Sequence, residues 1–199
     1  MSAPVYFIGW SFFRIIFRIF GRVKVSGLKN IPAGSGCIIA SNHISNFDPP
    51  LVGSSLNKRI YYMGKKELFE NPVFAWVLRQ MNVFPVNREG SDHGAIRTAL
   101  KILSGKKILL MFPQGTRMAD DGDLLNFKGG IGFFACRARV PVVPCLVQNT
   151  EALFPRRRMR VTFGEPVYPP AGEGKQNKEA ARFLAEEVIA GIKKLKGSD

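Results

Sequence analysis

Residues 36–50 read GCIIASNHISNFDPP: an apolar run, a turn holding one histidine and one aspartate, and two prolines. Residues 36–40 are typical of a short buried strand, because a brief apolar run bounded by turn residues suits a strand that is covered on both faces. Pro49 and Pro50 suit the first turn of a helix, which places Asp48 at its expected N-cap. The stretch therefore predicts a strand, a turn and a helix in direct succession.

Three further runs repeat this strand signature: residues 60–63, 107–112 and 142–147. Helix-like segments lie between them, at residues 71–81, with Asn71 as the N-cap, and at residues 94–103. A last helix is expected to start at Asn177, after a loop-like stretch that does not justify a further domain. Alternating strands and helices predict an α/β fold with a mostly parallel central sheet flanked by helices.

Length, charge and cysteine content narrow the class of protein. The chain has 199 residues, within the usual range of one domain, and its net charge of +14 favours an anionic partner: a phospholipid membrane, nucleic acid or a phosphorylated substrate. Its three cysteines, Cys37, Cys136 and Cys145, are not in metal-ligand spacing. We expect them to be reduced core residues of a cytoplasmic protein.

The N-terminal segment, residues 5–20, reads VYFIGWSFFRIIFRIF and carries a narrow basic stripe at helical spacing. It is shorter than a membrane-spanning helix and has Arg14 and Arg18 inside it, so lying in the membrane interface is the favoured solution. A core helix whose arginines extend to solvent is the alternative. We therefore predict a membrane-interface helix in residues 1–24 and one domain in residues 25–199. No signal peptide fits, so a peripheral or monotopic protein on the cytoplasmic face of the cell membrane is expected.

His43 and Asp48 follow a predicted strand at its carboxyl end, where ligand sites of open α/β sheets lie. On a regular helix two residues five apart would point about 140° away from each other, so the loop must curl to bring them together. Asp48 could then accept the proton of one imidazole nitrogen and leave the other nitrogen to deprotonate a hydroxyl. The alternative is that Asp48 only caps its helix and His43 is an ordinary loop residue.

Three other blocks carry basic or proline residues at strand ends: residues 112–117 (FPQGTR), 83–88 (VFPVNR) and 140–144 (VPVVP). The glycines of the first block, and those that follow Lys128, let backbone amides approach an anion, and Arg117 and Lys128 can neutralise a phosphate. For Arg88 and Arg117 the alternative is surface salt bridging, and for the proline-flanked strand it is ordinary sheet packing.

Together these blocks, in this order and at similar separations, resemble the glycerolipid acyltransferase family, the lysophosphatidic acid acyltransferases that make phosphatidic acid. The resemblance spans about residues 37–144. It implies a 1-acyl-sn-glycerol-3-phosphate O-acyltransferase of phospholipid biosynthesis, with residues 25–199 as the acyltransferase domain. The implied partners are lysophosphatidic acid, the membrane phospholipid surface, and acyl carrier protein or coenzyme A as the acyl thioester. The resemblance implies no metal, no further cofactor and no nucleic acid.

The resemblance also implies roles for residues of this chain. His43 of the H-x4-D motif, with Asp48, would activate the acceptor hydroxyl. Phosphate binding would fall to four basic residues: Arg88, Arg117, Lys65 in the stretch GKKELF, and Lys128. Acceptor positioning would fall to three consecutive residues: Gln114, Gly115 and Thr116. Gln114 departs from the usual F-P-E-G-T-R of the family, since it keeps hydrogen-bonding capacity but lacks the carboxylate.

Other functions stay open at this point. An acyltransferase for a different lysolipid, or a non-catalytic lipid-binding relative, is compatible with Gln114. A nucleic-acid-binding protein is supported by charge alone, and a serine hydrolase is disfavoured because no G-x-S-x-G motif occurs. Residues 69–81, with Phe74, Trp76 and Leu78, are a candidate lining for the acyl chain, although core packing is the preferred interpretation. Residues 156–158, three arginines, could contact lipid head groups or an acidic carrier protein.

Overall fold

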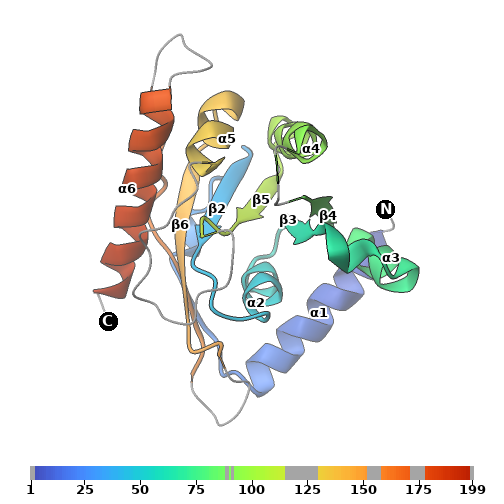
Figure 1. Cartoon of the computed structure of the whole chain (residues 1–199). Coiled ribbons are helices and arrows are strands. Elements are labelled where there is room, and N and C mark those ends of the chain that lie inside the picture. Colours follow the sequence, from blue (N-terminus) through green and yellow to red (C-terminus); the bar gives the residue numbers. More distant parts are fainter. Residues whose placement is uncertain are drawn as a thin grey trace.

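A sheet of mostly parallel strands forms the centre of the protein (Figure 1). The computed structural model describes residues 3–87, 90, 92–114, 130–151, 158–170 and 178–197. Within these residues seven strands form one sheet, in the order β1-β7-β6-β2-β5-β3-β4. The strands are β1 (Lys24–Ser26), β2 (Cys37–Ser41), β3 (Ile60–Lys65), β4 (Val83–Val86), β5 (Ile108–Met111), β6 (Val142–Gln148) and β7 (Arg160–Phe163). Every neighbouring pair is parallel except β6 and β7, so the predicted mostly parallel α/β fold is confirmed.

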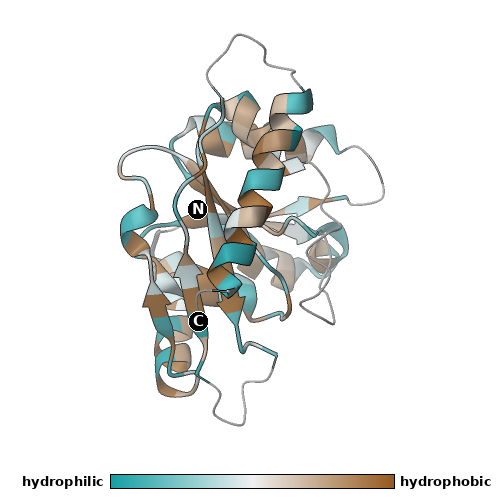
Figure 2. Ribbon diagram, turned by 90° about the vertical axis from the view of Figure 1, so that its left-hand side faces the viewer, coloured by the Kyte–Doolittle hydropathy of each residue, from teal (hydrophilic) through white to brown (hydrophobic). Residues whose placement is uncertain are grey.

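Helices cover both faces of the sheet, which is why its strands read as continuous apolar runs. The described helices are α1 (Ala3–Ile19), α2 (Asp48–Ser55), α3 (Pro72–Gln80), α4 (His93–Ser104), α5 (Gly130–Ala138) and α6 (Lys178–Lys196), with short 3₁₀ turns at Leu28–Asn30 and Lys66–Phe69. Side chains of α4, α5 and α6 pack with Ile38 and Ala40 on one face, and those of α1 and α2 with Cys37 and Ile39 on the other. Figure 2 shows the mostly hydrophobic strands behind α6.

Most predicted boundaries hold to within a few residues, and one cap is wrong. Asn71 caps α3 as predicted, since its side chain accepts hydrogen bonds from the N–H groups of Val73 and Phe74. Asp48, however, is the first residue of α2, and Phe47 is the N-cap. Asn177 lies outside the described residues, which resume at the start of α6. The burial of Leu184, Val188 and Ile192 confirms the apolar seam of that helix.

Helix α1 packs with one side against α2 and reaches β3 through the Tyr6 hydroxyl, which accepts the Ile60 N–H at 3.1 Å. Tyr6 and Phe17 are buried, and the indole N–H of Trp10 donates to the Leu56 carbonyl at 2.9 Å. Arg14 donates to the Asn57 side chain at 2.6 Å. Large apolar residues on the other side of the helix are exposed. Among the described helices, none combines the length and hydropathy needed to cross a bilayer.

The cysteines are free, as predicted, and two are fully buried. Burial raises the pKa of the Cys37 thiol to about 12, and burial also raises the pKa of the Cys145 thiol to about 12, with the nearby Asp48 charge adding to it. Cys136 is only partly buried, and burial raises its pKa as well. Because the thiolate is the reactive form of cysteine, these thiols are poor nucleophiles.

Candidate active site

The candidate site residues follow the carboxyl ends of four adjacent strands. In sheet order these strands are β2, β5, β3 and β4, and all are parallel. His43 follows β2, Gln114 follows β5, Lys65 ends β3, and Val86 ends β4 two residues before Arg88. Parallel strands end at the same edge of a sheet, so segments far apart in the sequence are placed in one row.

His43 and Asp48 form a hydrogen-bonded pair in this row. The His43 Nδ1 atom lies 2.9 Å from Asp48 Oδ2, and the two side chains are 13% and 0% exposed. Because a carboxylate oxygen accepts, Nδ1 carries the proton and Nε2 holds a free lone pair. Within the described part of the chain, Nε2 makes no hydrogen bond. The imidazole is therefore oriented to take a proton at Nε2.

The loop between the two residues curls as this pairing requires. Asp48 Oδ2 also accepts the backbone N–H groups of Ile44 and Ser45, both at 2.7 Å. The Ser45 hydroxyl accepts the N–H of Phe47 at 3.2 Å, which tightens the turn further. The carboxylate thus turns back from the first position of α2 onto the preceding loop. Asp48 binds this loop instead of capping its own helix, so the capping alternative does not describe its contacts.

The second carboxylate oxygen of Asp48 is held by a distant residue. Thr150, which follows β6, donates its hydroxyl to Asp48 Oδ1 at 2.5 Å and is fully buried. Among the described residues the Asp48 side chain therefore meets four donors and no acceptor, as suits an ionised carboxylate. A buried charge with this many hydrogen bonds is well compensated and holds a single geometry. The negative charge next to His43 would stabilise an imidazolium formed by proton abstraction.

Two neighbours fix the position of His43 from other sides. The ring of His43 stacks on Phe112, with centroids 4.1 Å apart and planes 22° apart. Just before it, the buried Asn42 side chain exchanges two hydrogen bonds with the backbone of Val147, at 2.7 and 2.8 Å. These contacts tie the end of β2 to both neighbouring strands, so the histidine backbone is anchored before the loop begins.

Gln114 contacts the backbone of the histidine. Its Oε1 atom accepts the His43 N–H at 3.0 Å, and the residue is buried. Either an amide or a carboxylate can accept this bond. Glutamine, in place of the glutamate usual in the resembling family, therefore keeps the hydrogen bond to the His43 N–H.

Two replacements of Gln114 should separate the need for an acceptor oxygen from the effect of a negative charge at this position. Gln114→Glu keeps the acceptor oxygen, so we expect its kcat to stay within about tenfold of the parent. Gln114→Leu leaves the His43 N–H unpaired, which should lower the free energy of unfolding by about 1–3 kcal/mol. A displaced histidine should then lower kcat by about 100-fold. Steady-state kinetics and thermal unfolding of both variants would check this, and equal activities for the two would contradict it.

The structure places some predicted residues and not others. Lys65 is exposed at the end of β3 and pairs in register with Val86. At about 4.8 Å between strands, β3 and β4 lie roughly 10 and 14 Å from β2. Five predicted residues lie outside the described ranges: Arg88, Gly115, Thr116, Arg117 and Lys128. The strands that lead to Arg88 and Arg117 nevertheless end in the same row as β2.

Sequence reasoning missed Thr150, Asn42 and Phe112 as parts of the site. Thr150 is 102 residues from Asp48, and nothing in the local pattern distinguishes it from an ordinary loop threonine. Asn42 lies directly beside the histidine and is buried, but it fell in the predicted turn after residues 36–40, where a polar residue is ordinary. Phe112 was part of a quoted block, but its stacking on His43 depends on β2 and β5 being neighbours.

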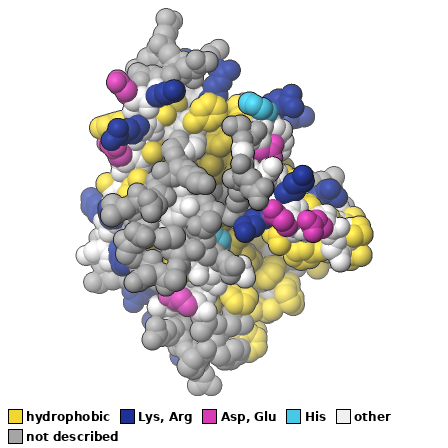
Figure 3. Space-filling view, in the orientation of Figure 1, with side chains coloured by type: hydrophobic (Ala, Val, Ile, Leu, Met, Phe, Trp, Pro, Cys, Tyr) yellow, Lys and Arg dark blue, Asp and Glu magenta, His cyan; other side chains and the backbone are white. Residues whose placement is uncertain are grey.

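Residues 69–81, the candidate lining for an acyl chain, are more exposed than the preferred interpretation, core packing, predicts. Phe74 and Trp76 in α3 are 47% and 55% exposed, so core packing is wrong for them. Leu78 is partly buried. Figure 3 shows hydrophobic side chains gathered on the face formed by α3 and α1. These residues are available to an apolar partner outside the fold.

Known proteins resemble the chain over most of its length. A sequence model described as Acyltransferase matches residues 22–148, more than half of the chain. A 1-acyl-sn-glycerol-3-phosphate acyltransferase of Bacillus subtilis is 33% identical over 186 residues, covering 92% of each chain. One of Streptococcus pneumoniae is 27% identical, covering 91% of this chain and 69% of that one. The crystal structure of the 1-acyl-sn-glycerophosphate acyltransferase of Thermotoga maritima matches with a TM-score of 0.70 and 28% identity, over 97% of this chain and 78% of that one.

Proposed function

The chain belongs to the acyltransferase family, and we propose that it acylates 1-acyl-sn-glycerol-3-phosphate (lysophosphatidic acid). The product is phosphatidic acid, and the reaction is a step of phospholipid biosynthesis. The observation that carries the proposal is the buried Asp48 carboxylate, which holds His43 with Nε2 available at the carboxyl edge of the sheet. A base in this position suits removal of a proton from an alcohol, and the acyl acceptor of the proposed reaction is the free glycerol hydroxyl.

His43 would act as the general base. Its Nε2 would take the proton of the free glycerol hydroxyl while that oxygen attacks the thioester carbonyl, and the C–S bond breaks to release a thiolate as the ester forms. The proton on Nε2 can then pass to the departing sulfur, which returns the histidine to its starting state. Asp48 would stabilise the imidazolium between the two steps. No side chain of the protein needs to be acylated in this sequence.

The acceptor phosphate would bind away from the base along the same edge. Lys65 stands two strands away from His43, and the strands before Arg88 and Arg117 end in the same row. At about 4.8 Å between neighbouring strands, β5, which precedes Arg117, lies directly beside β2, whereas β3 and β4 lie roughly 10 and 14 Å from β2. The spans to β3 and β4 exceed the distance between the phosphate and the reactive hydroxyl of the acceptor, so the loops after these two strands would have to turn inward. We propose Arg88, Arg117, Lys65 and Lys128 as the phosphate ligands, and Gln114, Gly115 and Thr116 as residues that position the acceptor.

The acyl donor would be a thioester of acyl carrier protein or of coenzyme A. Direct transfer uses this co-substrate and calls for no metal and no further cofactor. The high net charge of +14 favours either donor, because both are anionic.

Acceptor-dependent thiol release tests the proposed function. The full chain is incubated with a long-chain acyl thioester, with and without lysophosphatidic acid, and the free thiol and the lipid product are measured. We expect release that requires the acceptor and matches phosphatidic acid formation. Release that is equal with and without acceptor would indicate a thioesterase and would overturn the proposal.

Acylation of a different lysolipid is the second candidate function, because Gln114 stands in the FPQGTR block in place of the glutamate that the family resemblance predicts. The same assay with a panel of lysolipids that differ only in the head group separates the two. Activity that is highest with a lysolipid lacking a phosphomonoester would favour the second candidate.

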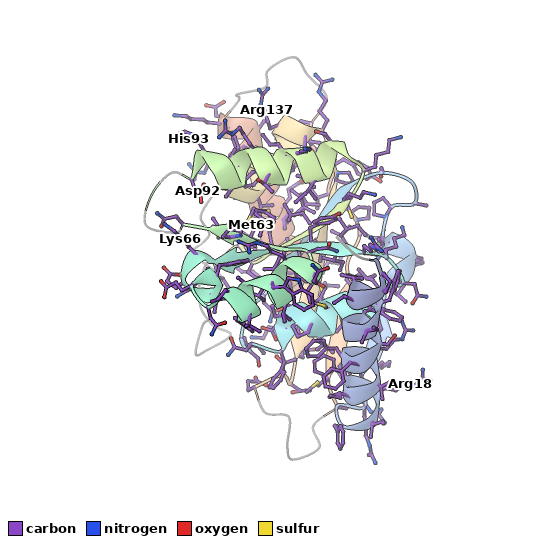
Figure 4. The ribbon with its side chains drawn as sticks, turned by 90° about the vertical axis from the view of Figure 1, so that its right-hand side faces the viewer. Arg18, Met63, Lys66, Asp92, His93 and Arg137 are labelled. Atoms are coloured by element: carbon purple, nitrogen blue, oxygen red, sulfur yellow. The ribbon has the colours of Figure 1, made fainter. Side chains whose placement is uncertain are left out.

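We also propose that the protein attaches to the cytoplasmic face of the cell membrane through α1. Exposed apolar residues recur along this helix: Phe7, Ile8, Phe12, Ile15 and Ile19. At about 100° per residue they fall within a stripe about 140° wide. Val73, Phe74, Trp76 and Val77 add exposed apolar surface on α3, and both helices face the viewer in Figure 4. An apolar stripe beside basic residues is typical of helices that lie in a membrane interface.

Ile15→Asp should weaken attachment to neutral vesicles. Burying an aliphatic side chain contributes about 1.5–3 kcal/mol, so the partition coefficient should fall roughly tenfold to 100-fold. Phe183→Asp on α6 is the matched control, because Ile15 and Phe183 are both 58% exposed and α6 lies on the other side of the sheet. Sedimentation with phosphatidylcholine vesicles measures the effect. An equal loss in the two variants would argue against α1 as the attachment surface.

A further inference from the structure

A basic groove, formed by Arg18, Arg22, Val23, Lys24 and Arg158, lies at the carboxyl end of α1. It is an open space of about 390 Å³, and of the five described residues that line it four are cations and none is acidic. In the part of the chain that the structure describes, none of these four side chains takes part in an ion pair. Arg18 projects outward from the end of the helix in Figure 4. The positive charge of the groove is therefore uncompensated within this region.

Backbone pairing brings the groove residues together from separate segments. The N–H of the buried Met159 donates to the Gly21 carbonyl at 2.9 Å, and the N–H of Lys24 donates to the Met159 carbonyl at 2.9 Å. These two bonds place Arg158 beside the connection between α1 and β1. The fold requires this backbone contact, but it does not require cationic side chains at the positions that flank it.

Arg22 is an unfavourable choice for its backbone position. Its φ angle is 46°, in the left-handed region that follows many helices and that glycine adopts without strain. Attraction of cations to the helix carboxyl terminus would account for Arg18 and Arg22. It does not account for Lys24 and Arg158, which come from outside the helix. Lys106 and Arg139, which follow α4 and α5, also have positive φ angles, so the conformation of Arg22 alone does not single out the groove. The distinguishing feature is that cations from the end of α1, from β1 and from the segment before β7 line one groove.

We infer that the groove binds the phosphate of an anionic phospholipid in the bilayer. The last turns of α1, which carry Arg18, also expose Ile15 and Ile19, and Phe20 directly after the helix is exposed as well. Cations next to large apolar side chains match a surface in which phosphate lies above hydrocarbon, and an acidic carrier protein offers no such hydrocarbon layer. The inference rests on the proposed attachment of α1 to the membrane. It adds a head-group site that would orient the protein on an anionic bilayer.

Two variants of equal net charge test the inference. The groove variant combines Arg18→Gln, Lys24→Gln and Arg158→Gln. The control variant combines three exposed cations of α4 and α5: Arg97→Gln, Lys101→Gln and Arg137→Gln. Figure 4 shows Arg137 and Arg18 at opposite ends of the molecule. Partitioning is measured with vesicles of phosphatidylcholine alone and of phosphatidylcholine with phosphatidylglycerol.

We expect the groove variant to lose about 100-fold in partitioning onto the anionic vesicles, at about fivefold per cation, and to match the parent on neutral vesicles. The control variant should stay within about fivefold of the parent, because its cations lie far from the bilayer. Equal losses in the two variants would overturn the inference, since net charge alone would then explain binding. If the groove variant bound vesicles as the parent does and lost turnover only with the carrier-protein thioester, the groove would bind the carrier protein, and the inference would also be overturned. The binding measurement needs no turnover, so failure of the proposed acyl transfer would not affect it.

Arg22→Gly separates structure from binding. Glycine relieves the left-handed backbone strain, so the melting temperature should equal or exceed that of the parent. Loss of one groove cation should nevertheless lower partitioning onto phosphatidylglycerol vesicles about fivefold. A purely structural role for Arg22 predicts the reverse: a lower melting temperature with unchanged partitioning.

Discussion

Replacing His43 by alanine is expected to lower kcat for acyl transfer by at least about 10² to 10⁴, the usual contribution of a well-placed general base. The imidazole is held by the Asp48 carboxylate and the ring of Phe112, and the backbone N–H of His43 is held by Gln114. Water cannot replace a base that is oriented in this way. The loss should appear in kcat with little change in KM, because the imidazole acts in the transition state. Acceptor-dependent thiol release measures both constants.

The second histidine of the chain supplies the control. His93 is exposed at the start of α4 and is labelled in Figure 4. His93→Ala should retain the parental kcat and melting temperature. If His43→Ala retained acceptor-dependent release at the parental rate, the role of general base would have to be withdrawn.

Asp48→Asn is expected to lower both stability and activity. The carboxylate accepts four hydrogen bonds, three of them at Oδ2, whereas a carboxamide oxygen has two lone pairs. At least one buried donor is left unpaired and the charge is lost, so the free energy of unfolding should fall by about 3 kcal/mol. A neutral amide also cannot stabilise the imidazolium, and kcat should fall by about 10² to 10⁴.

Thr150→Val is the matched variant for Asp48→Asn. It removes only the bond to Asp48 Oδ1 and leaves the His43 contact in place. We expect a loss of about 1–3 kcal/mol in unfolding free energy but a kcat within about tenfold of the parent. Chemical denaturation and kinetics on the same samples make the comparison. Similar kcat values for the two variants would mean that Asp48 only holds the loop together.

Strands and helix ends were predicted reliably where a few neighbouring residues determine them. The strand at residues 36–40 and the Asn71 cap of α3 were predicted closely, because a short apolar run and an Asn-Pro pair specify local geometry. Asp48 was misplaced as an N-cap because the same carboxylate can bind either its own helix or the loop before it. Local sequence does not decide between these two sets of donors.

Exposure was the least predictable property. Phe74 and Trp76 have the composition of a core segment, yet both lie on the surface. Hydrophobicity alone does not tell whether a helix face meets the sheet or an outside partner. The same limit applies to α1, whose Tyr6 and Phe17 are buried while Ile8 and Ile19 are exposed.

The residue pattern was enough to predict an α/β fold with a mostly parallel sheet, and four ordered blocks pointed to the family. The sequence also named His43 and Asp48, because their spacing at a strand end is visible without a structure. Only the tertiary structure decided that the loop curls, that Thr150 reaches Asp48 across 102 residues, and that Arg158 joins the end of α1. Short-range patterns record backbone preference and burial, whereas these contacts depend on which strands become neighbours, a property of the whole chain.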